Sequence, residues 1–129
     1  MWIDDWQMQC CGDPFAVGST MTWSTVPVTD TTGFAVFLDP AVAASITDHE
    51  ERHPYNDHEV NELHEITGVV TSIDAAFCRY VTNNGISEPA AGSGICEPRS
   101  QVTNGWESRP GDEELSFVGY LVMVETADE

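Results

Sequence analysis

Two β-type runs that lie far apart in the sequence constrain the fold of this chain most strongly. Residues 66–81 are rich in β-branched and aromatic residues, which predicts a strand with a short break at Asp74-Ala75. Phe117–Thr126 is apolar on both of its alternating faces, as is typical of a strand that is central or covered on both sides. Gly68 is expected to form a bulge that curves the first run. These runs predict a chain that is mainly β.

The N-terminal third of the chain predicts two further strands. Trp2–Gln9 alternates polar and apolar residues, which predicts a half-buried strand with Trp6, Met8 and Cys10 on its inner face. A Gly-Asp-Pro turn then ends the strand. Ser19–Val28 predicts a second strand, antiparallel to the first and ending near a proline.

The rest of the chain mixes strand, helix and loop. Phe34–Leu38 fits a buried strand, although a helix stays open as an alternative across residues 34–46. Asp39-Pro40 predicts the N-cap and first position of a short helix over Ala41–Ile46. Residues 82–114 hold five of the ten glycines, which predicts a long loop or lid with a short strand near Gln101–Thr103. Residues 1–129 therefore predict one domain, a small, partly open β-barrel of the OB-like or SH3-like kind, with one short helix and long polar loops.

The charge of the chain restricts its partners. It contains 22 Asp and Glu residues against four Arg and no Lys, for a formal net charge of −18. Such a surface repels nucleic-acid phosphates and anionic membranes, so neither is an expected partner. A basic protein, a cation or a neutral small molecule fits this field. Solubility or adaptation to salt accounts for the charge without any partner.

The expected compartment is the cytoplasm. No stretch approaches the ~20 apolar residues of a membrane span. The N-terminal residues lack the basic and apolar regions of a signal peptide. All four cysteines are accordingly expected to be reduced.

One motif suggests catalysis. Residues 49–53 match H-E-x-x-H letter for letter. On a helix, His49 and His53 would bind zinc and Glu50 would act as the base of a zinc-dependent hydrolase or metallopeptidase. However, Pro54 follows at once and the flanking residues form no apolar helix face. A chance match in a solvated acidic loop is the competing interpretation.

Metal binding without catalysis is a separate hypothesis. His49, His53, His58 and His64 lie close together in the sequence, and Cys11 is the candidate that would join them as a zinc ligand. The chain has no C-x-x-C pair with zinc-finger spacing. A polar loop and a thiol at the end of a strand explain the same residues without a metal.

Three residues are candidate contacts for a ligand or partner. Trp106 lies in a polar loop, where a tryptophan either caps a pocket, anchors a partner or folds back onto the end of the barrel. Cys10 and Phe15 flank the Gly-Asp-Pro turn. The residues favour a non-enzymatic binding or interaction module, monomeric or homodimeric, whose partner is a protein or small molecule. The alternatives are the zinc-dependent hydrolase and an acidic regulatory protein that binds a basic partner.

The block Trp6–Phe15, with the sequence WQMQCCGDPF, places an aromatic, a thioether and two thiols before a turn. Together with Trp23, Gly68–Ile73 and Phe117–Leu121, it resembles a family of small uncharacterised proteins from actinobacteria over nearly the whole chain. The resemblance implies no activity, because none is assigned to that family. Its members tend to carry adjacent histidines near Arg52-His53, which implies that the H-E-x-x-H match is incidental and that His53 stays a candidate ligand.

Overall fold

The computed structural model describes residues 1–50, 64–108 and 114–126, and for Cys11 the backbone alone. Within these ranges the protein is mainly β, with three short helices. The strands are β1 (Trp2–Asp4), β2 (Phe15–Ala16), β3 (Thr20–Pro27), β4 (Asp48–Glu50), β5 (His64–Cys78), β6 (Tyr80–Asn83), β7 (Ile86–Pro89), β8 (Ile95–Arg99), β9 (Gln101–Val102) and β10 (Ser116–Thr126). The helices are α1 (Asp5–Cys11), α2 (Thr32–Phe37) and α3 (Pro40–Ala44). None of these helices is long and apolar enough to cross a membrane.

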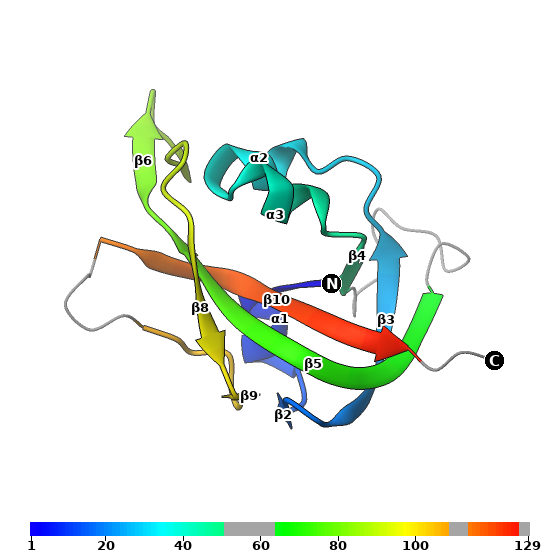
Figure 1. Ribbon diagram of the computed structural model, residues 1–129. Coiled ribbons are helices and arrows are strands. Elements are labelled where there is room, and N and C mark those ends of the chain that lie inside the picture. The colour runs from blue at the N-terminus through cyan, green and yellow to red at the C-terminus, as the bar shows by residue number, and fades with distance from the viewer. Residues whose placement is uncertain (51–63, 109–113, 127–129) are drawn as a thin grey trace.

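The two long β runs pair with each other as antiparallel strands β5 and β10, and Figure 1 shows them running together through the molecule. Their register shifts twice, around Val118 and around Thr71, where one strand carries an extra residue. The predicted break at Asp74-Ala75 is wrong, because both residues pair with β10 inside a continuous strand. β10 lies between β1 and β5, as the apolar character of both its faces predicted.

Gly68 is not the predicted bulge. It pairs in register with Met21 of β3 and with Thr126 of β10. A Cβ atom there would lie 2.5 Å from the carbonyl oxygen of Glu125. The position therefore requires glycine because two backbones approach closely, and the bulges lie elsewhere in the pair.

The pairings of the main sheet return to their starting strand. The strand order is β10-β1-β4-β3-β5-β8, and β10 also pairs with β5. One edge of β5 pairs with β3 through residues 64–69 and with β8 through residues 73–77, while β10 occupies the other edge. The predicted pairing of the first two strands is wrong. β1 pairs with β10 and β4, whereas β3 pairs with β4 and β5.

The predicted first strand ends after three residues and continues as helix α1. Because residues two apart on a helix lie on different faces, Met8 is buried while Trp6 is 49% exposed. The prediction that Trp6 and Cys10 point inward is therefore wrong, because both residues are exposed. The helix is anchored by Gln7, whose buried side-chain amide donates to the carbonyl oxygen of Glu50 at 2.7 Å.

Helices α2 and α3 lie together on one side of the sheet (Figure 1). Residues 34–37 belong to α2, so the strand predicted over Phe34–Leu38 is wrong. The prediction for the following helix is confirmed: the side chain of Asp39 accepts a hydrogen bond from the backbone N–H of Ala41 at 2.9 Å, and Pro40 opens α3.

Buried apolar residues of the described ranges form two clusters, on opposite faces of the sheet. One contains Ile3 and Phe77, together with Met8 from α1. The other contains Trp2 and Ala76 and packs against α2 and α3. Neighbouring residues of β1 and β5 enter different clusters because successive side chains of a strand point to opposite faces.

The segment predicted as a long loop or lid contains further strands. β6 and β7 form a hairpin whose two-residue turn, Asn84-Gly85, has φ angles of 54° and 80°. Positive φ at both positions is typical of a type I′ turn. β9 confirms the short strand predicted near Gln101–Thr103, and it pairs with β2.

Candidate functional site

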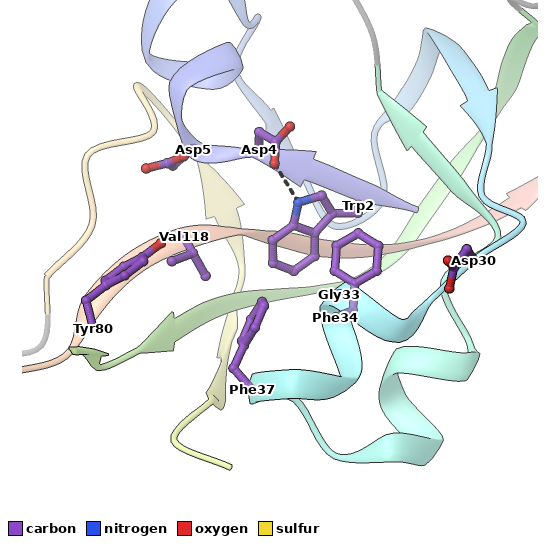
Figure 2. Close-up of a pocket in the computed structure, with 9 residues that line it drawn as sticks. All are labelled: Trp2, Asp4, Asp5, Asp30, Gly33, Phe34, Phe37, Tyr80 and Val118. Atoms are coloured by element: carbon purple, nitrogen blue, oxygen red, sulfur yellow. Dashed lines mark hydrogen bonds between the residues drawn. The ribbon is translucent and has the colours of Figure 1, made fainter. Parts of the chain in front are cut away.

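A cavity of about 280 Å³ lies between β1, helix α2 and the start of β6 (Figure 2). We call it the aromatic pocket. Its lining comprises four aromatic residues, Trp2, Phe34, Phe37 and Tyr80, three carboxylates, Asp4, Asp5 and Asp30, and the small residues Gly33 and Val118. No lysine, arginine or histidine belongs to this set of lining residues.

Three of the rings hold one another in place. The centroids of Trp2 and Phe34 are 5.1 Å apart and those of Trp2 and Phe37 are 6.3 Å apart, with the rings inclined at 54° and 67°. Such inclined pairs are favourable arrangements of aromatic quadrupoles. Trp2 and Phe37 are buried, whereas Tyr80 is 44% exposed. The pocket therefore has a packed base and one solvent-accessible aromatic wall.

Local structure explains why these rings converge. Trp2 and Ile3 point to opposite faces of β1, which directs the indole toward α2. Phe34 and Phe37 are three residues apart on α2 and so share one of its faces. On the neighbouring strand β10, Gly119 leaves room for the indole, because a Cβ atom there would clash with the Trp2 ring.

Asp4 connects the aromatic pocket to β4. Its Oδ1 atom accepts a hydrogen bond from Trp2 Nε1 at 2.9 Å, and its Oδ2 atom lies 2.6 Å from His49 Nε2. Burial alone would raise the pKa of Asp4. The hydrogen bonds of His49, Trp2 and Gln7 and the charge of His49 outweigh burial and hold the pKa of this carboxyl below its usual range. Asp4 therefore stays ionised at neutral pH.

The other ionisable groups differ in their environments. Burial raises the pKa of Asp5, and the charge of Asp4 raises it further by a smaller amount. A hydrogen bond from the backbone of Trp6 lowers this pKa but does not outweigh burial. Burial and the nearby Cys78 and Asp5 raise the pKa of Tyr80, which keeps its hydroxyl neutral. Asp30 accepts hydrogen bonds from the backbone N–H and the hydroxyl of Thr32, which lower its pKa. The pocket thus joins aromatic faces to negative charge.

The two described residues of the H-E-x-x-H match lie on strand β4. His49 is held by Asp4, while Glu50 is buried and its carbonyl oxygen accepts from Gln7. Adjacent residues of a strand point to opposite faces, so His49 and Glu50 lack the helical frame on which the zinc-hydrolase prediction depends. His53 lies outside the described residues.

The remaining metal candidates are only partly described. His64 opens β5 as an exposed residue, His58 lies outside the described residues, and nothing is described of the Cys11 side chain. The described residues contain no group of three or more His, Cys, Asp or Glu that could hold a metal ion. A zinc site at the histidines therefore stays a sequence-based prediction.

The cysteines differ from the expectation that all of them are reduced. Cys10 is disulfide-bonded, which makes that expectation wrong for this residue. Cys78 and Cys96 are free, the first buried and the second exposed. Burial raises the pKa of the Cys78 thiol, and the partial desolvation of Cys96 together with the nearby charge of Asp74 raises the pKa of the Cys96 thiol.

The candidate contact residues Phe15 and Trp106 have opposite environments. Phe15 is buried, with its ring edge-on to Trp23 at 5.3 Å between centroids. Trp106 is 71% exposed and does not fold back onto the sheet. The adjacent Glu107 fixes its loop by accepting hydrogen bonds from Tyr120 Oη at 2.6 Å and Arg99 Nε at 2.9 Å. Neither Phe15 nor Trp106 lines the aromatic pocket.

The aromatic pocket was not among the sites predicted from the sequence. The pattern of Trp2–Gln9 places Trp2 in a strand without indicating a pocket, and the pattern of Phe34–Leu38 fits a strand where Phe34 and Phe37 form one face of α2. The available signal was the i, i+3 spacing of these two phenylalanines, together with an aspartate on each side of the helix at positions 30 and 39.

Fold and site together define a small, mainly β protein with an aromatic pocket bordered by carboxylates. The chain belongs to a family of unknown function, DUF6578, whose sequence model matches residues 1–126. The match confirms the expectation of a family without an assigned activity. Searches of curated proteins and of solved structures returned no significant match.

Proposed function

We propose that this protein is a non-enzymatic binding module that holds an organic cation, an ammonium or guanidinium group, in the aromatic pocket. The observation that carries the proposal is the lining itself: four aromatic rings and three carboxylates around about 280 Å³. The faces of aromatic rings attract cations, and cages of such rings recognise quaternary ammonium ligands. Asp5 and Asp30 would add a second attraction of the same sign, whereas Asp4 is already paired with His49.

The size and charge of the protein support this choice of ligand. A cavity of about 280 Å³ is slightly smaller than the ~300–1,000 Å³ of typical ligand pockets, and it suits the end of a side chain or a small amine. A formal net charge of −18 would draw cations toward the protein and repel anions. A neutral ligand would bury the carboxylates without compensating their charge.

We also infer that the closed circuit of strands β10, β1, β4, β3 and β5 is a small barrel, as the sequence led us to expect. The circuit of pairings and the apolar cluster around Ile3 and Phe77 support this inference. In such a barrel the aromatic pocket lies on the outer surface, beneath α2, because Trp2 and Ile3 point to opposite faces.

Binding of choline tests the proposal, with 3,3-dimethylbutan-1-ol as a neutral ligand of the same shape. We expect choline to shift the NMR signal of the Trp2 indole N–H with a dissociation constant of about 1 mM, and the alcohol to bind at least about tenfold more weakly. Equal binding of the two ligands would contradict the proposal, because shape rather than charge would then decide.

Two variants locate the binding in the aromatic pocket. Tyr80→Leu keeps an apolar side chain but removes the exposed ring, and Asp5→Asn removes one carboxylate. Each is expected to weaken choline binding by about threefold to tenfold. Trp106→Leu is the matched control, because it removes an exposed aromatic ring that does not line the pocket. If Trp106→Leu weakens binding as much as Tyr80→Leu, the site has been assigned wrongly.

A further inference from the structure

A second depression adjoins the aromatic pocket on the side of the β6–β7 hairpin. This hairpin groove has a volume of about 460 Å³ and is lined by Val36 of α2 and by Val81, Glu88, Pro89 and Ala90 of the hairpin segment. Gly33 lines both cavities, and Tyr80 of the aromatic pocket directly precedes Val81 of the groove. The two cavities are therefore neighbours across helix α2 and strand β6.

The groove belongs to an exposed apolar surface. Val36 and Val81 are 45% and 42% exposed, and Tyr80 beside them is 44% exposed. Exposed apolar patches with polar residues at their margin are typical of interaction sites. The hairpin that carries two of these residues is paired only with itself in the described sheets, so this surface stands apart from the main sheet.

We propose that both cavities are occupied by one segment of a basic partner protein, with a lysine or arginine side chain in the aromatic pocket and a nearby apolar side chain in the hairpin groove. The proposal rests on the proposed function, because the cationic group is what occupies the aromatic pocket. A peptide segment is the occupant that supplies a cation and an apolar group at neighbouring positions. Free small amines supply only the first.

Charge complementarity selects a foreign basic segment over the other occupants. A second copy of this chain would bring another formal charge of −18 and has no lysine and only four arginines to offer. An anionic membrane would be repelled by the same field. Glu88 in the groove and Asp5 and Asp30 in the pocket place carboxylates in both cavities, which favours cationic residues around the apolar contact.

Short synthetic peptides test this proposal. The probes are the series acetyl-Lys-(Gly)n-Leu-amide with zero to three glycines, the same peptides with serine in place of leucine, and choline alone, each titrated by NMR. We expect that for at least one spacing leucine strengthens binding about fivefold or more over serine, because it transfers apolar surface into the groove. Replacing lysine by norleucine should abolish binding of that peptide.

Variants of the groove separate its role from that of the aromatic pocket. Val81→Ser, and independently Val36→Ser, should remove the advantage of leucine while choline binds as before. Ile86→Ser is the matched control, since Ile86 is exposed on the same hairpin but lines neither cavity. It should leave both measurements unchanged.

The outcomes distinguish the two proposals. If choline binds but leucine gives no advantage at any spacing, the partner proposal is wrong and the cation pocket stands. If choline does not bind and the peptides bind without regard to lysine, the proposed function fails and the partner proposal falls with it. An advantage of leucine that survives both Val81→Ser and Val36→Ser would place the apolar contact outside the groove and would overturn the proposal as well.

Discussion

Asp4 is the residue on which the pocket and the sheet both depend. One of its oxygens holds the indole of Trp2 and the other holds His49 on β4. A single carboxylate therefore orients the base of the aromatic pocket and ties β1 to its parallel neighbour. Its two partners, Trp2 and His49, are 47 positions apart in the sequence, so no local sequence pattern predicts this link.

Replacing Asp4 by Asn is expected to lower stability in a pH-dependent way. The folded-state pKa of Asp4 is held below the ordinary value of 3.8, so its contribution is present above that pH and is lost as the pH falls through the lowered pKa. Near pH 5 the variant should be less stable by about 1–3 kcal/mol. Below pH 3.8 the difference should shrink, as urea unfolding at several pH values would reveal. A difference that grows on acidification would refute this role of Asp4.

Gly119 is expected to tolerate no side chain. A Cβ atom at this position would clash with the Trp2 ring and lie 2.6 Å from the carbonyl oxygen of Ile3. Gly119→Ala should lower the free energy of unfolding by about 1–3 kcal/mol, as overpacking does, and should shift the NMR signal of the Trp2 indole. A variant as stable as the wild type, with an unmoved indole, would show that β1 and β10 separate easily.

Helix α2 is the element that turns a sheet face into a pocket. Its six residues place Phe34 and Phe37 over Trp2 and carry Val36 toward the hairpin groove. Its end is fixed from outside, because the backbone N–H groups of Gly92 and Gly94 donate to the carbonyl oxygens of Val36 and Phe37 at 2.8 and 2.7 Å. Tertiary contacts therefore support a helix that is too short to be stable alone.

Gly33→Ala tests whether α2 is limited by its own backbone. A Cβ atom at this helical position would meet nothing within 4 Å, so alanine adds helix propensity without a clash. We expect the free energy of unfolding in urea to rise by about 0.5–1 kcal/mol. A loss of stability would mean that the glycine is needed for a backbone movement of α2, in contrast to the steric need for glycine at position 119.

At the scale of the whole molecule, charge is the dominant property. A formal net charge of −18 on 129 residues gives strong self-repulsion, which disfavours the compact state and is screened by salt. The same field would steer cations to the aromatic pocket. Stability and ligand binding are therefore expected to respond to ionic strength in opposite directions.

The thermal unfolding midpoint should rise by about 5 °C between roughly 0.02 and 0.5 M NaCl. Choline binding should weaken over the same range, because salt screens its attraction to the carboxylates. Scanning calorimetry measures the first effect, and sucrose at matched osmolarity controls for solute exclusion, which stabilises folded proteins without screening charge. A midpoint that does not change with salt would show that the acidic side chains are too far apart to repel one another.

The sequence by itself determined the mainly β class, the two long strands, the capped helix at Asp39-Pro40 and the acidic surface. Each of these follows from local pattern or composition, as when apolar residues on both faces of Phe117–Thr126 predict that β10 is a central strand. The type I′ turn at Asn84-Gly85 also has a local signal, because an Asn-Gly pair favours this turn.

Only the tertiary structure decided the helices at residues 5–11 and 32–37, the order of the strands and the existence of the aromatic pocket. Trp6 and Met8 alternate as in a strand, yet the segment forms helix α1, which buries Met8 and leaves Trp6 exposed. Trp2, Phe34 and Tyr80 each look like ordinary apolar residues in sequence. Their convergence depends on which strands pair and on where α2 packs, and both are set by contacts between residues far apart in the chain.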